Sequence, residues 1–250
     1  MNELFEGERI DIVNDKLRLI QKTDGLTFGT DALLLAGYVG TRGAYGIEFG
    51  SGSGIISLLL LARGKLAHAV CLEVQEEYAE LTQRNAELNG FSESLTSECC
   101  DVRSFKPAAE ADIVFSNPPY MKTTSGKPNA LGKKNVARHE VLGDIGDFLK
   151  AASRMLKFGG SFAAVYRPDR LADLINAMRE AKIEPKRATF VHSDTERESS
   201  MVLIEGKRGG NPGMRLTPPL FIYKNPVSRE YTHEMNYIME NGSFPSKYLV

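Results

Sequence analysis

Short apolar runs and amphipathic segments alternate along most of the chain. Runs rich in β-branched and aromatic residues predict strands over residues 44–49, 68–73, 95–100, 112–116 and 161–166. Segments with apolar residues at helical spacing predict helices over residues 53–64, 75–89, 145–157 and 168–181. Two further strands are predicted in succession, with no helix between them, over 187–192 and 200–207. This order predicts an α/β fold with helices on both faces of a mostly parallel sheet and one antiparallel strand near its edge.

The two ends of the chain depart from this alternation. The N-terminal end predicts a hairpin from residues 10–13 and 17–20, followed by a helix over 31–39. The C-terminal end is rich in glycine and proline, with a short helix expected over 232–240. We therefore expect three parts, namely an N-terminal hairpin and helix (1–40), a main domain (41–208) and a C-terminal tail (209–250).

Two interruptions of the pattern carry further expectations. Residues 121–143 are polar, and a loop of that length inside a compact domain is usually functional or disordered. The pair Gly159-Gly160 is expected to close the helix over 145–157, because glycine commonly follows the last helical turn.

Composition limits the class of protein. The 250 residues suit one large α/β domain, alone or with a small appendage. The three cysteines, Cys71, Cys99 and Cys100, are odd in number and lack zinc spacing, so neither a disulfide framework nor a metal site is expected. The acidic start has no apolar segment typical of a signal peptide, and the uncharged stretch over 49–62 is too short to span a bilayer. We expect a cytoplasmic protein.

Charge is distributed unevenly although the net charge is only −1. The first hundred residues contain 8 basic and 15 acidic side chains, whereas the remainder contain 23 basic and 17 acidic ones. Such asymmetry is typical of a protein that presents a basic surface to a polyanion on one side, although an ordinary solvated surface would also account for it.

A glycine-rich loop follows the first predicted core strand. Glu48 precedes Gly50, Gly52 and Gly54, and these glycines allow the backbone to approach a ligand closely. The spacing lacks the third glycine of the dinucleotide fingerprint, which argues against NAD. The carboxylate of Glu48 would repel a pyrophosphate but attract an ammonium group. This chemistry favours the methionine end of S-adenosylmethionine.

Further acidic residues end the next two predicted strands. Glu73 is placed to accept hydrogen bonds from ribose hydroxyls at the carboxyl edge of the sheet. Asp101, followed by Val102, is placed where a carboxylate can meet the amino group of an adenine. Acids at three successive strand ends, together with the loop, predict one cofactor site.

The fourth strand ends in Asn117-Pro118-Pro119-Tyr120. Two prolines end the strand and stiffen the turn, so the Asn117 side chain and the Pro118 carbonyl become two hydrogen-bond acceptors in one crevice. Two acceptors that hold the N–H bonds of a planar amine turn its lone pair toward a methyl donor, and Tyr120 offers a flat face to a base. Such a site would catalyse methyl transfer mainly by aligning the amine with the methyl donor and by the fixed dipoles of its acceptors.

These motifs together resemble the class I S-adenosylmethionine-dependent N-methyltransferases. The segment from Lys22 to Leu35, which contains Phe-Gly-Thr-Asp-Ala, and the later Arg138-His139-Glu140 are similar to the bacterial tRNA(Val) adenine-37 N6-methyltransferase family. The resemblance implies a Rossmann-like, seven-stranded fold whose last strand is antiparallel. It also implies that Phe28 and Thr30 close over the cofactor, and that the Asn-Pro-Pro-Tyr motif engages an adenine of a tRNA.

A basic segment follows Tyr120 directly. Its cations are Lys122, Lys127, Lys133, Lys134 and Arg138, against Glu140 alone. A basic loop next to a base pocket is expected to bind RNA phosphates.

Other functions share parts of this pattern. A protein-glutamine N5-methyltransferase acts on a planar amine as well, and so does a ribosomal RNA guanine N2-methyltransferase. A binding protein without catalysis is disfavoured by the intact Asn117 and Tyr120, and a nicotinamide oxidoreductase by the glycine spacing. We expect a monomeric methyltransferase with tRNA as its partner and no membrane or metal partner.

Overall fold

The computed structural model describes residues 4–24, 28–118 and 145–249. Two strands near the N-terminus form a hairpin, β1 (Glu8–Asn14) and β2 (Leu17–Lys22). The other strands form one sheet and are β3 (Ala44–Phe49), β4 (Leu66–Glu73), β5 (Leu95–Cys99), β6 (Ala111–Ser116), β7 (Leu156–Tyr166), β8 (Ile183–His192), β9 (Ser199–Arg208), β10 (Arg215–Leu216) and β11 (Leu220–Phe221).

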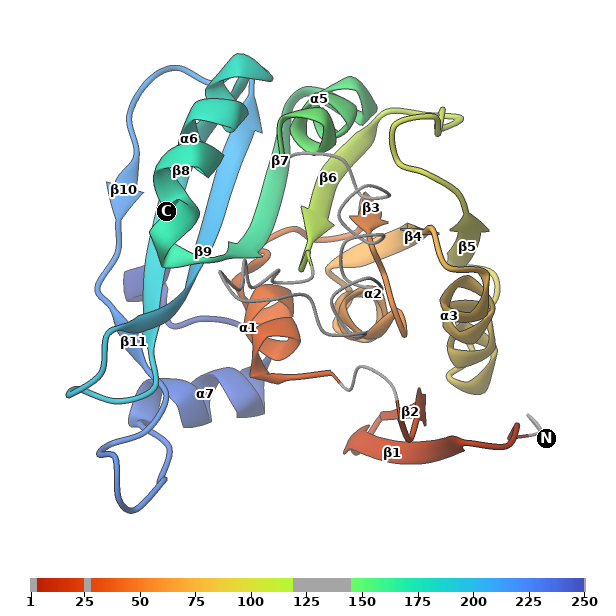
Figure 1. Ribbon diagram of the computed structural model, residues 1–250, viewed down its shortest axis with the longest axis horizontal. Coiled ribbons are helices and arrows are strands. Elements are labelled where there is room, and N and C mark those ends of the chain that lie inside the picture. The colour runs from red at the N-terminus through yellow and green to blue at the C-terminus, as the bar shows by residue number, and fades with distance from the viewer. Residues whose placement is uncertain (1–3, 25–27, 119–144, 250) are drawn as a thin grey trace, which may run out of the picture.

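Helices cover both faces of this sheet (Figure 1). The described α-helices are α1 (Thr30–Tyr38), α2 (Ile55–Ala62), α3 (Glu76–Leu88), α5 (Ile145–Met155), α6 (Leu171–Glu180) and α7 (His233–Asn241). The described residues also include two short 3₁₀ helices, η1 (Pro168–Arg170) and η2 (Ser246–Tyr248). The predicted alternation of strands and helices is therefore confirmed.

The sheet has the order β10-β8-β9-β7-β6-β3-β4-β5, and β11 also pairs with β8. Every pair is parallel except those that β9 makes with β7 and β8. The predicted antiparallel strand is thus present, inserted between two strands of the opposite direction. The seven predicted core strands are all present, and two short strands from the C-terminal segment extend the sheet.

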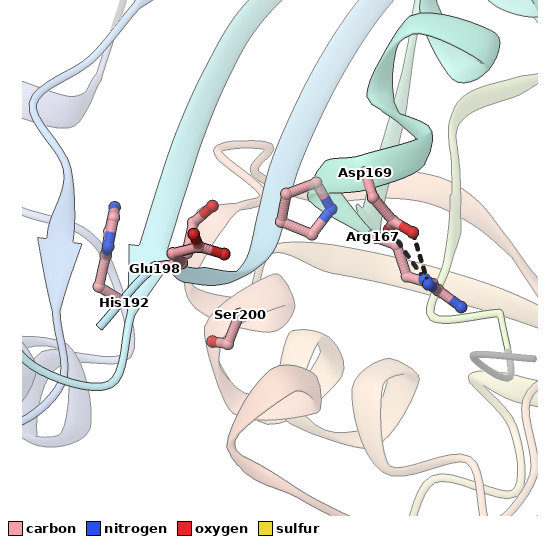
Figure 2. A pocket seen from close by; sticks show the side chains of 7 residues that line it. Arg167, Asp169, His192, Glu198 and Ser200 are labelled. Carbon is pink, nitrogen blue, oxygen red and sulfur yellow. Dashed lines mark hydrogen bonds and ion pairs between the residues drawn. The ribbon is translucent and has the colours of Figure 1, made fainter. Parts of the chain in front are cut away.

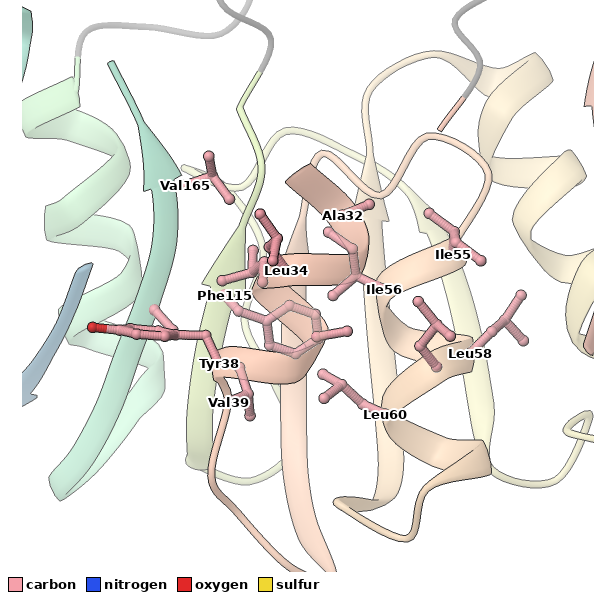
Figure 3. Close-up of a cluster of buried hydrophobic side chains, with 14 of the residues drawn as sticks. Ala32, Leu34, Tyr38, Val39, Ile55, Ile56, Leu58, Leu60, Phe115 and Val165 are labelled. Atoms are coloured by element: carbon pink, nitrogen blue, oxygen red, sulfur yellow. The ribbon is translucent and has the colours of Figure 1, made fainter. Parts of the chain in front are cut away.

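Alternation of side chains along the strands separates two cores. On one face, Phe115 and Val165 pack with apolar side chains of α1 and α2, among them Leu34 and Ile56 (Figure 3). On the opposite face, Val114 packs with buried residues of α5 and α6. Successive residues of one strand therefore serve opposite helix layers, as the two-residue period of a strand requires.

The pair Gly159-Gly160 does not end a helix, contrary to the sequence prediction. Helix α5 ends at Met155, and β7 runs through both glycines. A Cβ atom on Gly160 would lie 2.9 Å from the Lys157 carbonyl oxygen and 3.2 Å from the Ala111 carbonyl oxygen. Close backbone approach beside β6 therefore explains this glycine better than helix termination.

The segment after residue 208 packs onto the domain, whereas the sequence predicted only a tail with a short helix. Its strands β10 and β11 pair with β8, and α7 contributes Met235 and Ile238 to the core beneath α1. The Tyr38 ring makes an edge contact with Phe244 at 5.3 Å between centroids. The predicted helix over 232–240 is confirmed as α7.

Arg187 of β8 joins this C-terminal segment to α1 and the sheet. Its buried guanidinium donates to the carbonyl oxygens of Tyr248 and Tyr38, each at 2.8 Å, and to the Glu205 carboxylate at 2.5 Å. It also lies over the Tyr38 ring, 3.8 Å from the centroid. One cation thus satisfies acceptors from three separate segments.

A buried polar cluster holds the start of α2. The Glu48 carboxylate accepts hydrogen bonds from the Ser57 backbone N–H at 3.1 Å and from its hydroxyl at 2.5 Å. The Cys71 thiol lies 3.2 Å from the Ser57 hydroxyl. Burial raises the pKa of Glu48 from 4.5 to about 8. A carboxyl group whose charge is disfavoured here therefore bonds the N-terminal turn of a helix.

Replacing Arg187 with leucine is expected to lower the free energy of unfolding by about 3 kcal/mol, because its partners lose a buried cation. Urea denaturation measures the change. Arg179→Leu is the matched control, since Arg179 pairs with Glu184 on the surface with 56% of its side chain exposed. That variant should cost about 1 kcal/mol or less. Equal effects of the two substitutions would contradict the role given to Arg187.

Glu48→Gln is expected to gain stability relative to the wild type as pH rises. The folded pKa of about 8 exceeds the ordinary 4.5, so the stability that Glu48 contributes is present below about pH 4.5 and is lost as pH rises through 8. Free energies of unfolding are measured by urea denaturation at about pH 5.5 and 8.5. The difference between the two proteins should be larger at the higher pH by at least about 1 kcal/mol.

The matched control for this experiment is Glu234→Gln. Lys247 lowers the pKa of Glu234, so that carboxylate is ionised at both pH values and its substitution should give a constant difference. An equally constant difference for Glu48→Gln would show that Glu48 does not titrate in this range.

Candidate active site

The strand ends predicted to carry chemistry meet at one edge of the sheet. Phe49, the last residue of β3, pairs with Leu72 of β4 and with Ser116 of β6. Glu73 pairs with Cys99 at the end of β5. The chain segments that follow these parallel strands therefore lie side by side, as ligand-binding segments do in open α/β sheets.

A hollow opens at this edge, which we call the glycine-loop hollow. Its lining residues come from β4, α5 and the loops after β3, β4 and β5, and are Gly50, Leu72, Glu73, Val74, Cys100, Asp101, Val102 and Phe148. Four of the residues predicted for the cofactor are thus brought together, namely Gly50, Glu73, Asp101 and Val102. Four lining residues were not expected from the sequence, namely Leu72, Val74, Cys100 and Phe148. In the sequence, Phe148 looks like any apolar residue of an amphipathic helix.

The three loop glycines have different surroundings. Gly50 and Gly52 have φ values of 66° and 55°, and a Cβ on either would meet no atom within 4 Å. Both positions therefore favour glycine and leave the backbone open to a ligand. Gly54, with φ of 77°, precedes α2, and a Cβ there would lie 2.8 Å from the Thr82 Cγ2 atom. Gly54 thus permits close packing of the loop on α3.

The carboxylates of the hollow are held by backbone N–H groups and by an arginine. Glu73 accepts from the backbone N–H of Gly52 at 3.0 Å and of Gln75 at 3.1 Å. Asp101 accepts from the backbone N–H and guanidinium of Arg103, whose hydrogen bonds lower the pKa of that carboxyl. Both side chains therefore have a fixed orientation, and each Glu73 oxygen, which accepts one hydrogen bond here, retains capacity for a further donor.

Glu48 does not line the glycine-loop hollow. It is 1% exposed, and Ser57 and Cys71 surround its carboxyl group. It comes two residues before Gly50 and bonds the first turn of α2, so it holds that helix from within the core.

The N-terminal signature residues Phe28 and Thr30 lie between the hairpin and the body of α1. Phe28 is half-buried, packs against the core, and its backbone N–H is bonded to the Gln21 side chain at 2.9 Å. Thr30 is the first residue of α1 and is also half-buried. Neither residue lines the glycine-loop hollow.

Asn117 follows β6 as Gly50 follows β3. Its side-chain amide donates to the Asp31 carboxylate of α1 at 2.8 Å. Its other polar atom, Oδ1, is buried and has no hydrogen-bond partner among the described residues. The contact with Asp31 joins segments 86 residues apart, which no local pattern in the sequence indicates.

All but one of the remaining predicted residues lie outside the described part of the chain. Pro118 is described and half-buried. Those outside are Pro119, Tyr120, Lys122, Lys127, Lys133, Lys134 and Arg138.

A second hollow, which we call the β7–β8 hollow, lies at the carboxyl ends of those two strands. It has a volume of about 640 Å³ and is lined by Arg167, Pro168, Asp169, His192, Glu198, Ser199 and Ser200. Figure 2 shows Arg167 paired with Asp169 on one side and His192, Glu198 and Ser200 on the other. Two acids and one paired arginine favour a neutral polar ligand over an anion.

No cluster of three or more His, Cys, Asp or Glu side chains suited to a metal ion occurs in the described residues. Over the same residues, no helix has the length and apolar character needed to cross a bilayer.

Solved structures with similar folds include methyltransferases. A predicted O-methyltransferase from Agrobacterium tumefaciens superposes with a TM-score of 0.69 at 22% identity, covering 86% of this chain and 98% of that one. At this identity the likeness shows the fold, and the predicted Rossmann-like methyltransferase architecture is confirmed.

Curated relatives extend over most of the chain. A tRNA1(Val) (adenine(37)-N6)-methyltransferase of Porphyromonas gingivalis is 27% identical over 213 residues, covering 81% of this chain and 80% of the relative. A protein with the same name from Phocaeicola vulgatus is 26% identical over 207 residues, covering 82% and 84% respectively. The family model of the methyltransferase small domain matches residues 23–181, which include the glycine loop, Glu73, Asp101 and Asn117. The chain therefore belongs to the methyltransferase small domain family.

Proposed function

We propose that the protein transfers the methyl group of S-adenosylmethionine to the exocyclic N6 of an adenine in RNA, namely adenine 37 of a tRNA(Val). The names of its relatives support the substrate. The observation that carries the chemistry is the buried Oδ1 of Asn117, which has no partner in the described chain and lies at the strand end beside Gly50. A buried acceptor of this kind is satisfied by an incoming N–H donor.

The glycine-loop hollow has a volume of about 20 Å³ in this structure, and its lining offers groups that suit the parts of S-adenosylmethionine. The open backbone at Gly50 and Gly52 admits the amino acid part of the molecule, and Glu73 offers acceptors to ribose hydroxyls. The apolar wall formed by Val102 and Phe148 suits an adenine ring, with Asp101 at its edge. Phe28 and Thr30 would bound the cofactor from the N-terminal side. Glu48 would act by holding α2 and the loop, together with Gly54.

When bound, S-adenosylmethionine supplies a methyl group on a sulfonium sulfur, which leaves as a neutral thioether. Asn117 Oδ1 and the Pro118 carbonyl oxygen accept the two N–H bonds of the target amine and draw its nitrogen toward tetrahedral geometry. The lone pair then points at the methyl carbon and forms the new N–C bond. The methylated nitrogen releases a proton to water, so the chain needs no strong base and acts by alignment and dipoles.

RNA would approach over the edge that carries Asn117 and the β7–β8 hollow. A neighbouring nucleobase is a neutral polar ligand of the kind that this hollow favours. From the sequence, Pro119 and Tyr120 complete the base pocket. The cations proposed for phosphate contact are Lys122, Lys127, Lys133, Lys134 and Arg138. We further propose a monomer that acts in the cytoplasm, which agrees with three unpaired cysteines.

The proposed substrate is tested by comparing tRNA nucleosides from cells with and without the gene. Mass spectrometry should show loss of N6-methyladenosine from one tRNA, and purified protein with S-adenosylmethionine should restore it. Loss of an N2-methylguanosine from ribosomal RNA, or of N5-methylglutamine from a protein, would overturn the adenine assignment. Calorimetric titration should show binding of S-adenosylmethionine and not of NAD.

Asn117→Ala is expected to leave cofactor binding nearly unchanged and to lower methyl transfer at least about tenfold, because it removes an acceptor used mainly in the transition state. Single-turnover transfer and calorimetry measure the two effects. Asn176→Ala is the matched control, since Asn176 is exposed on α6 and bonds only Glu180 among the described contacts. Unchanged transfer in the Asn117 variant would refute the mechanism.

A further inference from the structure

We propose that Asp31 is a positioning residue for methyl transfer, which holds the Asn117 amide with its oxygen toward the target amine. This inference rests on the proposed function and deepens it. Asp31 is the second residue of α1 and receives the Asn117 amide at 2.8 Å. Its other oxygen, Oδ1, accepts from the Ala32 backbone N–H at 3.0 Å. The carboxylate is therefore oriented by the helix on one side and by Asn117 on the other.

The hydrogen-bonding chemistry of the pair defines which way the amide faces. A side-chain amide fits most sites in two orientations, related by exchange of its oxygen and nitrogen. An ionised carboxylate only accepts hydrogen bonds, so it can face the NH₂ group of Asn117 and not its oxygen. Turning the amide over would place two acceptors against each other. Asp31 thereby leaves Asn117 Oδ1 directed away from α1, buried and without a partner in the described chain.

The negative charge of Asp31 has a second effect. A hydrogen bond from an amide N–H to an anion polarises the amide and increases the negative charge on its oxygen. The target amine gains positive charge as the new N–C bond forms. A polarised Asn117 oxygen is therefore a stronger acceptor in the transition state than in the ground state, which is the condition for raising kcat.

The neighbouring glycine is explained by the same contact. A Cβ on Gly29 would lie 2.6 Å from Asp31 Oδ1, closer than a real Cβ contact allows. A larger residue at position 29 would displace the carboxylate from its place between Ala32 and Asn117. Gly29 and Asp31 of the N-terminal signature thus both help to hold the Asn117 amide, which lies 86 residues after Asp31 in the sequence.

The decisive test is a double-mutant cycle with Asp31→Ala and Asn117→Ala, measured as kcat on the tRNA substrate. Asp31→Ala alone should lower kcat about tenfold, with the affinity for S-adenosylmethionine and the KM for tRNA nearly unchanged. In the Asn117→Ala background the same substitution should lower kcat less than about twofold, because Asp31 acts through Asn117. The same loss in both backgrounds would overturn the proposal.

Two further variants separate positioning from a structural role. Asp31→Asn retains the shape of the side chain but lets it present either an oxygen or an NH₂ group, so kcat should still fall several-fold. Asp31→Glu should recover part of the activity that Asp31→Ala loses. The control is Asp173→Asn, the same change in the first turn of α6, where Asp173 is 55% exposed and pairs with Arg170. It should leave kcat and melting temperature unchanged.

Full activity of Asp31→Asn, or a loss explained by a lower fraction of folded protein in circular dichroism, would refute the positioning role. Failure of the proposed function looks different, because the wild type itself would then transfer no methyl group to tRNA. If the wild type instead methylates another planar amine, the same cycle on that substrate tests Asp31.

Discussion

The parallel register of β3 with both of its neighbours is the constraint on which the site depends. Phe49 pairs with Leu72 on one side and with Ser116 on the other, so the glycine loop, Glu73 and Asn117 begin at the same level. A slip of one residue would exchange the faces of β3 and move Ile47 and Phe49 out of the core that they share with α5 and α6. Core packing therefore enforces the geometry of the site.

Polar contacts behind the glycine loop give it a defined shape. Asn85 of α3 exchanges hydrogen bonds with Ile20 of the hairpin and also donates to the Ser53 carbonyl oxygen at 3.0 Å. Glu73 accepts from the Gly52 N–H within the same loop. Asn85 of α3 and Glu73 of β4 thus hold the loop directly, and the hairpin holds Asn85 in place. A loop shaped by buried hydrogen bonds loses little conformational entropy when a ligand binds.

The C-terminal segment stabilises α1, which supplies Asp31. Phe244 and Tyr248 are buried and lie near Tyr38, where Arg187 ties the end of α1 to β8 and to η2. Part of the chain that showed no recognisable motif therefore fixes the helix that meets Asn117. Its contribution is packing, and packing of this kind is distributed over many residues with no short sequence signature.

The sequence by itself determined the order of strands and helices, the glycine loop, and the polar residues at the ends of β4, β5 and β6. These features follow from local periodicity and from the conformational limits of glycine and proline, so a short stretch of adjacent residues is enough to predict them. Only the tertiary structure decided that Glu48 bonds Ser57, that Phe148 lines the hollow, and that Gly160 lies within a strand. It also decided that Asp31 meets Asn117. Side-chain direction and contacts between distant segments depend on how the layers pack, and this packing is a property of the whole chain.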